Sequence, residues 1–277
     1  MAGLLELPSE LLGQILDHLP LRSLLAFSEA SRAAHALALS SLHTLSLGVY
    51  PTRLASKISQ LAAGDWDPRG NHTISCRDEG NDHAVSLIIP RAESHDGNTL
   101  LTFHNALMSS VLSRYACSLR TLELSIWAMS RPIALALAEM HGLKSLSLRT
   151  ENPYSRLTMA GLGGWKPRNV VGPAATEDKR AWFLLASAWG RLEVLRLYGA
   201  RLGKLQLLQI LEANVCIREL WLKNCSKLGA EIWPLLGENW THRDSLTKLS
   251  VMGCCEVRDE SLQYIGNMKN LRVSTCP

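Results

Sequence analysis

Three side chains in one polar stretch of the sequence carry nitrogen or sulfur atoms that could bind a metal ion. His72, Cys76 and His83 are ligands of the kind that zinc prefers. The only candidates for a fourth ligand nearby are Asp78, Asp82 and His95. Because a structural zinc site needs four well-placed ligands and no fourth one is evident, the sequence predicts no metal site.

Cysteines in the last quarter of the chain could serve redox chemistry or pack as small apolar side chains. The chain has 7 cysteines, an odd number, and no two of them have C-x-x-C spacing. Cys225 and Cys254 each end a leucine pattern, at a position that is usually buried, and Cys255 follows directly. We therefore interpret them as packing residues with reduced thiols.

Signatures of catalysis are missing from the sequence. It contains no G-x-S-x-G nucleophile elbow, no phosphate-binding loop and no H-E-x-x-H zinc helix. The sequence therefore predicts a protein that is not an enzyme and that needs no cofactor.

Composition places the chain among ordered proteins that work inside the cell. Of the 277 residues, 47% are hydrophobic and 19% are charged, which is enough apolar material for a core. The net charge of +4 is too small to indicate binding to nucleic acid or to a membrane. The sequence has no apolar run of membrane-spanning length, and Glu6 and Pro8 stand where a secretory signal would be basic and then apolar. We expect a cytoplasmic or nuclear protein.

The first 41 residues are typical of three short helices. Leu7 and Pro8 open the first helix, whose apolar residues recur on one face, and Pro20 ends it. A second apolar turn follows, and a third helix starts near Ser31. A unit of this size rarely closes a core alone, so its apolar face needs the rest of the chain or another protein.

The pattern LPxELLxxILxxLPLxSLLAFS at residues 7–28 resembles an F-box, in the variant common in fungal proteins. The resemblance implies that residues 1–41 dock on the Skp adaptor subunit and, through it, on cullin. We expect the adaptor-facing surface and its support to comprise Leu7, Pro8, Ile15, Leu16, Leu19, Leu24, Leu25 and Phe27.

Leucines recur in the remaining chain as the pattern L-x-x-L-x-L. The pattern begins at Leu42, Leu119, Leu143, Leu192, Ile217 and Leu246, and more weakly at Leu271. Four of these steps span 24–29 residues, and we interpret the steps of 49 and 77 as nearly two and nearly three repeats. The pattern resembles leucine-rich repeats, and its endings at Cys225 and Cys254 resemble the cysteine-containing class that often follows an F-box.

The predicted fold is therefore α/β, with the F-box helices followed at 42–277 by an irregular leucine-rich-repeat solenoid. We expect about five to seven units, each a short parallel strand with an outer helix. Helices are predicted over 102–116, 131–141, 177–189, 204–214 and 259–268, and more weakly over 229–240, with a further strand over 85–89. Insertions are expected near 64–83 and 151–176, and the C-terminal end is expected to be irregular or incomplete.

Side chains between the leucines of each strand should face away from the core, because successive strand residues point to opposite sides. In the later units these are aromatic and basic: Arg149, Arg196, Tyr198, Trp221, Lys223 and Lys248. We hypothesise that they bind an acidic or phosphorylated target, with recognition by the 64–83 or 151–176 loops as the alternative. The pattern is equally typical of a solvated face, since Glu123 and Glu219 dilute its positive charge.

Together, the two resemblances imply a non-catalytic substrate receptor of an SCF (Skp–cullin–F-box) ubiquitin ligase. The alternative is a leucine-rich-repeat interaction scaffold that acts outside a ubiquitin ligase. The sequence does not identify the target protein.

Overall fold

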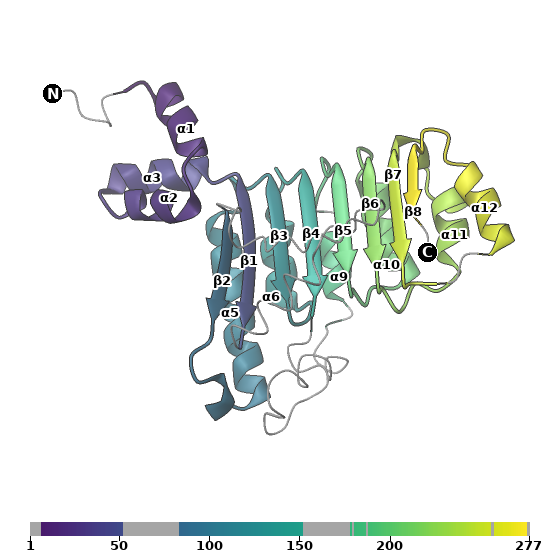
Figure 1. Ribbon diagram of the computed structural model, residues 1–277, viewed down its shortest axis with the longest axis horizontal. Helices are drawn as coiled ribbons and strands as arrows, with labels where there is room; N and C mark the ends of the chain where they lie inside the picture. The colour runs from purple at the N-terminus through teal and green to yellow at the C-terminus, as the bar shows by residue number, and fades with distance from the viewer. Residues whose placement is uncertain are drawn as a thin grey trace, which may run out of the picture.

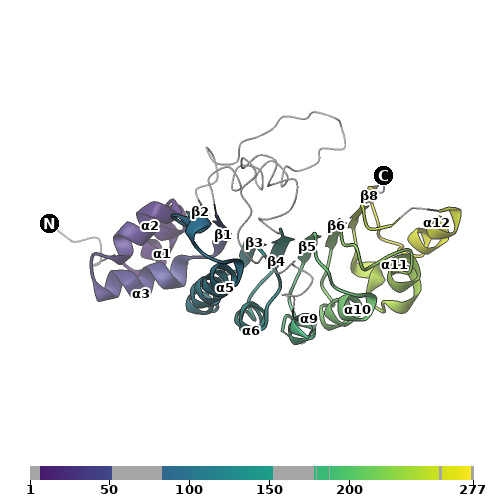
Figure 2. The same ribbon diagram turned by 90° about the horizontal axis from the view of Figure 1, so that it is seen from below.

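The computed structural model describes residues 7–51, 83–151, 178, 180–186, 188–255 and 258–275. Helices at the N-terminal end adjoin one edge of a curved sheet, and further helices cover one side of that sheet (Figure 1, Figure 2). The predicted insertions at 64–83 and 151–176 lie outside the described residues, except for His83 and Glu151.

Three helices form the N-terminal module: α1 (Ser9–Asp17), α2 (Leu21–Ser28) and α3 (Arg32–Ser41). Pro8 and Pro20 immediately precede α1 and α2, where a missing backbone N–H costs nothing. The Ser31 side chain caps α3 by accepting a hydrogen bond from the Ala34 amide at 3.1 Å. The predicted helices are thus confirmed.

The rest of the described chain is built around one parallel sheet with the strand order β2-β1-β3-β4-β5-β6-β7-β8. The strands are β1 (Thr44–Tyr50), β2 (Ala84–Ile88), β3 (Thr121–Ile126), β4 (Ser145–Thr150), β5 (Val194–Tyr198), β6 (Glu219–Lys223), β7 (Lys248–Met252) and β8 (Val273–Thr275). Each leucine pattern lies at one of these strands. The pattern leucines pair in register across the sheet and are buried, for example Leu122, Leu146 and Leu195.

Two interpretations of the leucine spacing are wrong. The 77-residue step was expected to hold nearly three repeats and the 49-residue step nearly two, yet β1 pairs directly with β3, and β4 pairs directly with β5. The strand predicted over 85–89 is β2, which lies on the outer side of β1. The number of residues between two leucine patterns does not determine which strands are neighbours, because neighbouring strands are those that exchange hydrogen bonds.

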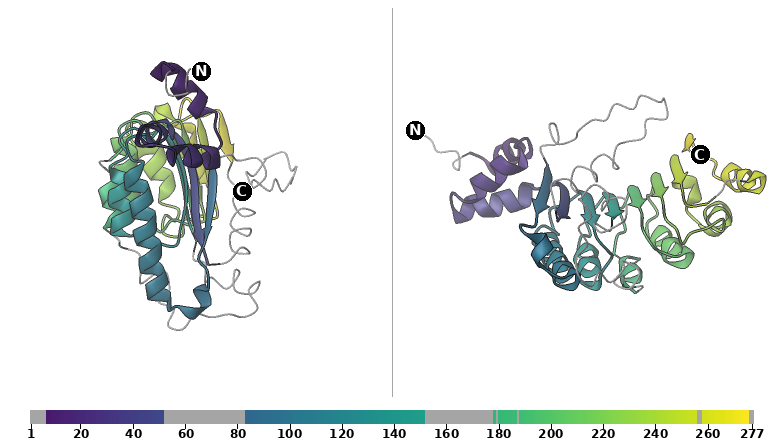
Figure 3. Two further views of the ribbon diagram at one scale, coloured as in Figure 1. Left: turned by 90° about the vertical axis from the view of Figure 1, so that its left-hand side faces the viewer. Right: turned by 60° about the horizontal axis from the view of Figure 1, so that its bottom comes forward.

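Helices cover one side of the sheet (Figure 3), and the pattern leucines are buried in the core. The helices are α5 (Gly97–Arg114), α6 (Arg131–Ala138), α9 (Ala181–Leu185), α10 (Lys204–Ala213), α11 (Ile232–Pro234) and α12 (Asp259–Gly266), with short turns η3 (Ala92–Ser94), η4 (Leu235–Asn239) and η5 (Arg243–Ser245). The weakly predicted helix over 229–240 is confined to α11 and the π-helical turn η4. No described helix is long and apolar enough to cross a membrane.

The strand ends share a left-handed turn that fixes the residues following β5, β6 and β7. Gly199, Asn224 and Gly253 have φ values of 67°, 56° and 62°. After two of these turns, the thiols of Cys225 and Cys254 donate to carbonyl groups of the preceding strand. The cysteines thus tie neighbouring strands together.

Candidate functional site

The residues expected to bind the adaptor divide into an exposed and an internal set. Leu7, Pro8, Ile15 and Leu25 are exposed, Leu19 and Phe27 are half-buried, and Leu16 and Leu24 are buried. The exposed side chains are available to a partner, and the buried ones support the helices that carry them. The adaptor-binding role of these residues stays a prediction.

One exposed residue of this module was not among those expected. Leu11 is 48% exposed and lies one turn before Ile15, so these two side chains share one face of α1, and the exposed Leu7 lies just before the helix begins. We call Leu7, Leu11 and Ile15 the α1 stripe. The opposite face of the helix packs inward through Leu12 and Leu16. The four-residue spacing was the signal in the sequence that could have found Leu11.

The residues expected to bind a target lie in register on β4, β5, β6 and β7. Arg149 pairs with Tyr198, which pairs in turn with Lys223. Two residues earlier along the strands, Arg196 pairs with Trp221. The parallel register therefore brings side chains from four separate stretches of sequence onto one face.

Both arginines of this face stack on the aromatic ring of the next strand. The guanidinium carbon of Arg149 lies 5.2 Å from the centroid of the Tyr198 ring. The same atom of Arg196 lies 5.2 Å from the Trp221 ring. Such stacking attracts the cation to the ring and fixes the plane of the guanidinium group.

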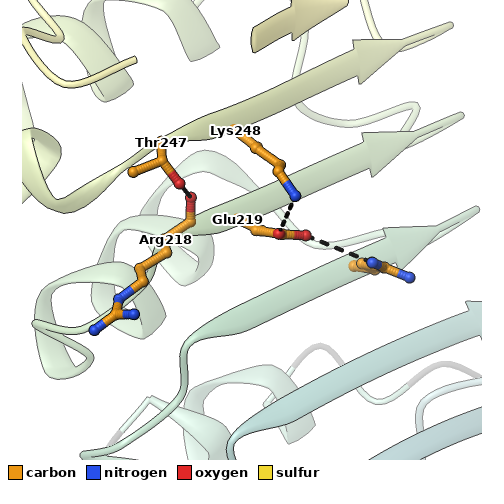
Figure 4. Close-up of polar contacts among 5 residues, drawn as sticks. Arg218, Glu219, Thr247 and Lys248 are labelled. Carbon is orange, nitrogen blue, oxygen red and sulfur yellow. Dashed lines mark hydrogen bonds and ion pairs between the residues drawn. The ribbon is translucent and has the colours of Figure 1, made fainter. Parts of the chain in front are cut away.

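Carboxylates partly neutralise the cations of this face. Glu219 contacts Lys248 at 2.7 Å and Arg196 at 3.5 Å, and so bridges β5 and β7 (Figure 4). Glu151 lies 3.5 Å from Arg149. Lys223 makes no ion pair with any described residue. The face is therefore an ordered array of alternating charges rather than a continuous basic field.

The charges beside Glu219 keep it ionised. Partial burial opposes ionisation, but the hydrogen bond and charge of Lys248, together with the charge of Arg196, outweigh it. The pKa of Glu219 consequently lies below its ordinary value. At neutral pH the carboxylate holds Arg196 and Lys248 in place.

The described residues contain no group of three or more histidine, cysteine or acidic side chains placed to bind a metal ion. Four of the considered ligands, His72, Cys76, Asp78 and Asp82, lie outside the described residues. Contact with Cys254, together with burial, raises the pKa of the Cys225 thiol, which therefore stays protonated. These contacts support the interpretation of Cys225 as a packing residue.

Comparison with known families identifies the N-terminal helices. Residues 4–44 match the F-box domain. An F-box domain indicates a Skp-binding adaptor of SCF-type ubiquitin ligases, and F-box proteins are generally non-catalytic. The match ends at the start of β1 and does not extend over the sheet. No curated protein matches the chain.

Proposed function

We propose that this F-box protein is a non-catalytic substrate receptor of an SCF-type ubiquitin ligase, acting in the cytoplasm or the nucleus. The N-terminal helices bind the Skp adaptor, and the sheet holds a target protein near the ubiquitin-conjugating enzyme that the cullin recruits. Holding the target there raises the effective concentration of its lysines at the reactive thioester. The F-box match over helices with exposed leucines is the observation that carries the proposal.

The apolar stripe of α1 supports the adaptor side of the proposal. Leu11 and Ile15, on adjacent turns of α1, expose 48% and 42% of their surface, and Leu7, just before the helix, exposes 37%. Exposed apolar side chains grouped in this way mark interaction surfaces, since a partner must remove them from water. Because the stripe belongs to the matched domain, the Skp adaptor is the partner it fits.

The repeated strands and their one-sided helices support the assignment of the sheet to leucine-rich repeats. Pattern leucines fill the side covered by helices, and the other side carries the aromatic and charged residues. Such solenoids bind partners on an extended, curved surface. We therefore place target binding on the strand face that carries Arg149, Arg196, Tyr198, Trp221, Lys223 and Lys248.

An acidic or phosphorylated segment fits this face best. Arg196 presents a planar guanidinium group already oriented by an aromatic ring, and this geometry suits carboxylates and phosphates. Arg149 is oriented in the same way but is buried. Lys223, without an ion pair among the described residues, offers a further charge to the target. An incoming anion competes with Glu219 for Arg196 and Lys248.

Co-purification of a tagged full-length chain tests the proposal. We expect both the Skp adaptor and cullin to be recovered, and the Leu7→Ala/Pro8→Ala variant to lose both while remaining folded. A matched control is Leu135→Ala, which removes an exposed leucine on α6, outside the F-box. Recovery of the adaptor without cullin would instead indicate a scaffold outside the ligase, and undiminished recovery with the double variant would overturn the proposal.

A further inference from the structure

An apolar groove of about 340 Å³ lies where the N-terminal helices meet the sheet. It is lined by residues of α2, β1, β2 and α5, together with Leu42, which follows α3, and Tyr115, which follows α5. The elements that line it lie at the end of the molecule that faces the viewer on the left of Figure 3. Its volume is within the range of sites that bind ligand groups or partner side chains.

The groove exists because the sheet ends at β2. In the middle of the sheet, leucines such as Leu122 and Leu146 have strands on both sides and are completely buried. Val85 and Leu87 on β2, and Leu107 and Val111 on α5, are only half-buried. At this edge of the sheet, β2 and α5 thus keep exposed apolar surface that a further strand and helix would cover.

Leu25 joins this groove to the F-box. It lies on α2 inside the matched domain, is 40% exposed and lines the groove. Leu21, one turn earlier, is buried in the groove wall. A partner that covers Leu25 on the F-box therefore meets the groove directly, and its contact continues onto α5.

We propose that the Skp adaptor docks in this groove as well as on α1, so that α5 supplies part of the adaptor-binding surface outside the F-box. This inference rests on the proposed function, because it takes the adaptor to be the partner of the F-box. The segment that enters is apolar and carries an acidic group, since Arg114 is the one cation among the described lining residues. The groove sets the orientation of the adaptor relative to the sheet, and hence the position of a bound target.

Calorimetric titration of the full-length chain with purified Skp adaptor tests this. The Leu107→Glu variant places a charge in the groove, and we expect it to weaken binding about tenfold or more. Its matched control is Leu135→Glu, at an exposed leucine of the neighbouring helix α6 that does not line the groove. We expect the control to bind as the unmodified chain does.

A third variant separates failure of the inference from failure of the proposed function. Leu11→Glu alters the α1 stripe and leaves the groove intact. Loss of binding with Leu11→Glu but unchanged binding with Leu107→Glu would overturn the groove inference alone. Unchanged binding with folded forms of both Leu11→Glu and Leu7→Ala/Pro8→Ala would overturn the adaptor role of the F-box itself.

Photo-crosslinking keeps the proposal testable if Leu107→Glu does not fold. A benzophenone amino acid at Ser110, an exposed residue that lines the groove, should crosslink to the adaptor. The same amino acid at Gln209, exposed on α10, should not. Crosslinking of position 110 to a second copy, or only within its own chain, would show that another occupant fills the groove and would overturn the proposal.

Discussion

Arg196 and Trp221 form the best-defined contact of the strand face. They are direct neighbours in the register of β5 and β6, and the Arg196 guanidinium carbon lies 5.2 Å from the centroid of the Trp221 ring. Glu219, on the same strand as Trp221, contacts Arg196 from the side at 3.5 Å. The guanidinium group is thus held by a ring and a carboxylate at once, which favours a single orientation.

The Arg196→Ala/Trp221→Ala variant tests whether this contact recognises the target. We expect it to lose target capture and to keep adaptor binding, because α1 and the groove are untouched. Proximity labelling with the ligase inhibited measures target capture, and adaptor pulldown measures adaptor binding. Lys204→Ala, on the helix side of the sheet, serves as the control for removal of a positive charge. An unchanged set of captured proteins would place recognition elsewhere.

Glu219→Gln should strengthen capture of an acidic target. The substitution keeps the shape of the side chain but removes the charge that competes for Arg196 and Lys248. We expect tighter binding at low salt and a steeper decline as salt increases, because more of the attraction is then electrostatic. Salt-dependent titration of the captured target with both forms gives the comparison. Weaker binding by Glu219→Gln would indicate that the target offers cations instead.

The sequence predicted much of the sheet because one feature, the leucine pattern, controls both burial and strand register. Once Leu195 and Leu220 face the core, Arg196 and Trp221 must face the other way. The position of β2 was not predictable, since no periodicity indicates on which side of β1 a strand pairs.

The charge pairing and the groove depend on contacts between distant residues. Lys248 and Glu219 are 29 residues apart, and only the β6–β7 register brings them together. The groove combines Leu25 of the F-box with Leu107, which lies 82 positions later and belongs to α5 (107 − 25). Nothing in the sequence around one member of these pairs indicates that it contacts the other.

His104 should make the protein less stable in mild acid. It is buried in α5 and stacks on Trp127 with ring centroids 4.7 Å apart. Burial lowers the pKa of His104 to about 4, against a smaller opposing effect of the Asn105 hydrogen bond. Between pH 6.5 and 4 the unfolded chain binds this proton and the folded chain does not, so stability falls as the pH decreases.

From pH 7 to pH 5 we expect His104 to account for a loss of about 2 kcal/mol in the free energy of unfolding. Urea denaturation of the unmodified chain and of His104→Phe at both pH values measures it. The phenylalanine variant keeps an aromatic ring beside Trp127 but has no group to titrate. Equal losses in the two proteins would show that His104 does not control the acid response.

Gly199 should tolerate no side chain, because of the left-handed turn after β5. Its φ is 67°, and a β-carbon there would lie 2.5 Å from the Thr150 carbonyl oxygen. We expect Gly199→Ala to destabilise the fold by about 1–3 kcal/mol. Gly190→Ala is the matched control, since a β-carbon at Gly190 meets nothing within 4 Å. Thermal unfolding of both variants gives the comparison. Equal unfolding midpoints would contradict the strain expected from a side chain at position 199.

Neighbouring leucines of α1 should separate adaptor binding from folding. Leu11 is 48% exposed and Leu12 is 4% exposed, although they are adjacent in sequence. Leu11→Ala should therefore weaken adaptor binding and leave the unfolding midpoint nearly unchanged, because its side chain is exposed in the folded chain and available to a partner. Leu12→Ala removes a buried side chain and should destabilise the module by about 2–5 kcal/mol.

Calorimetric titration with the adaptor and urea denaturation, applied to both variants, distinguish the two roles. A folded Leu12→Ala protein should bind the adaptor more tightly than Leu11→Ala does, since it keeps the outward stripe of Leu7, Leu11 and Ile15 intact. The reverse order of affinities would mean that the adaptor approaches α1 from the side that the structure buries, and the assignment of the stripe would then be wrong.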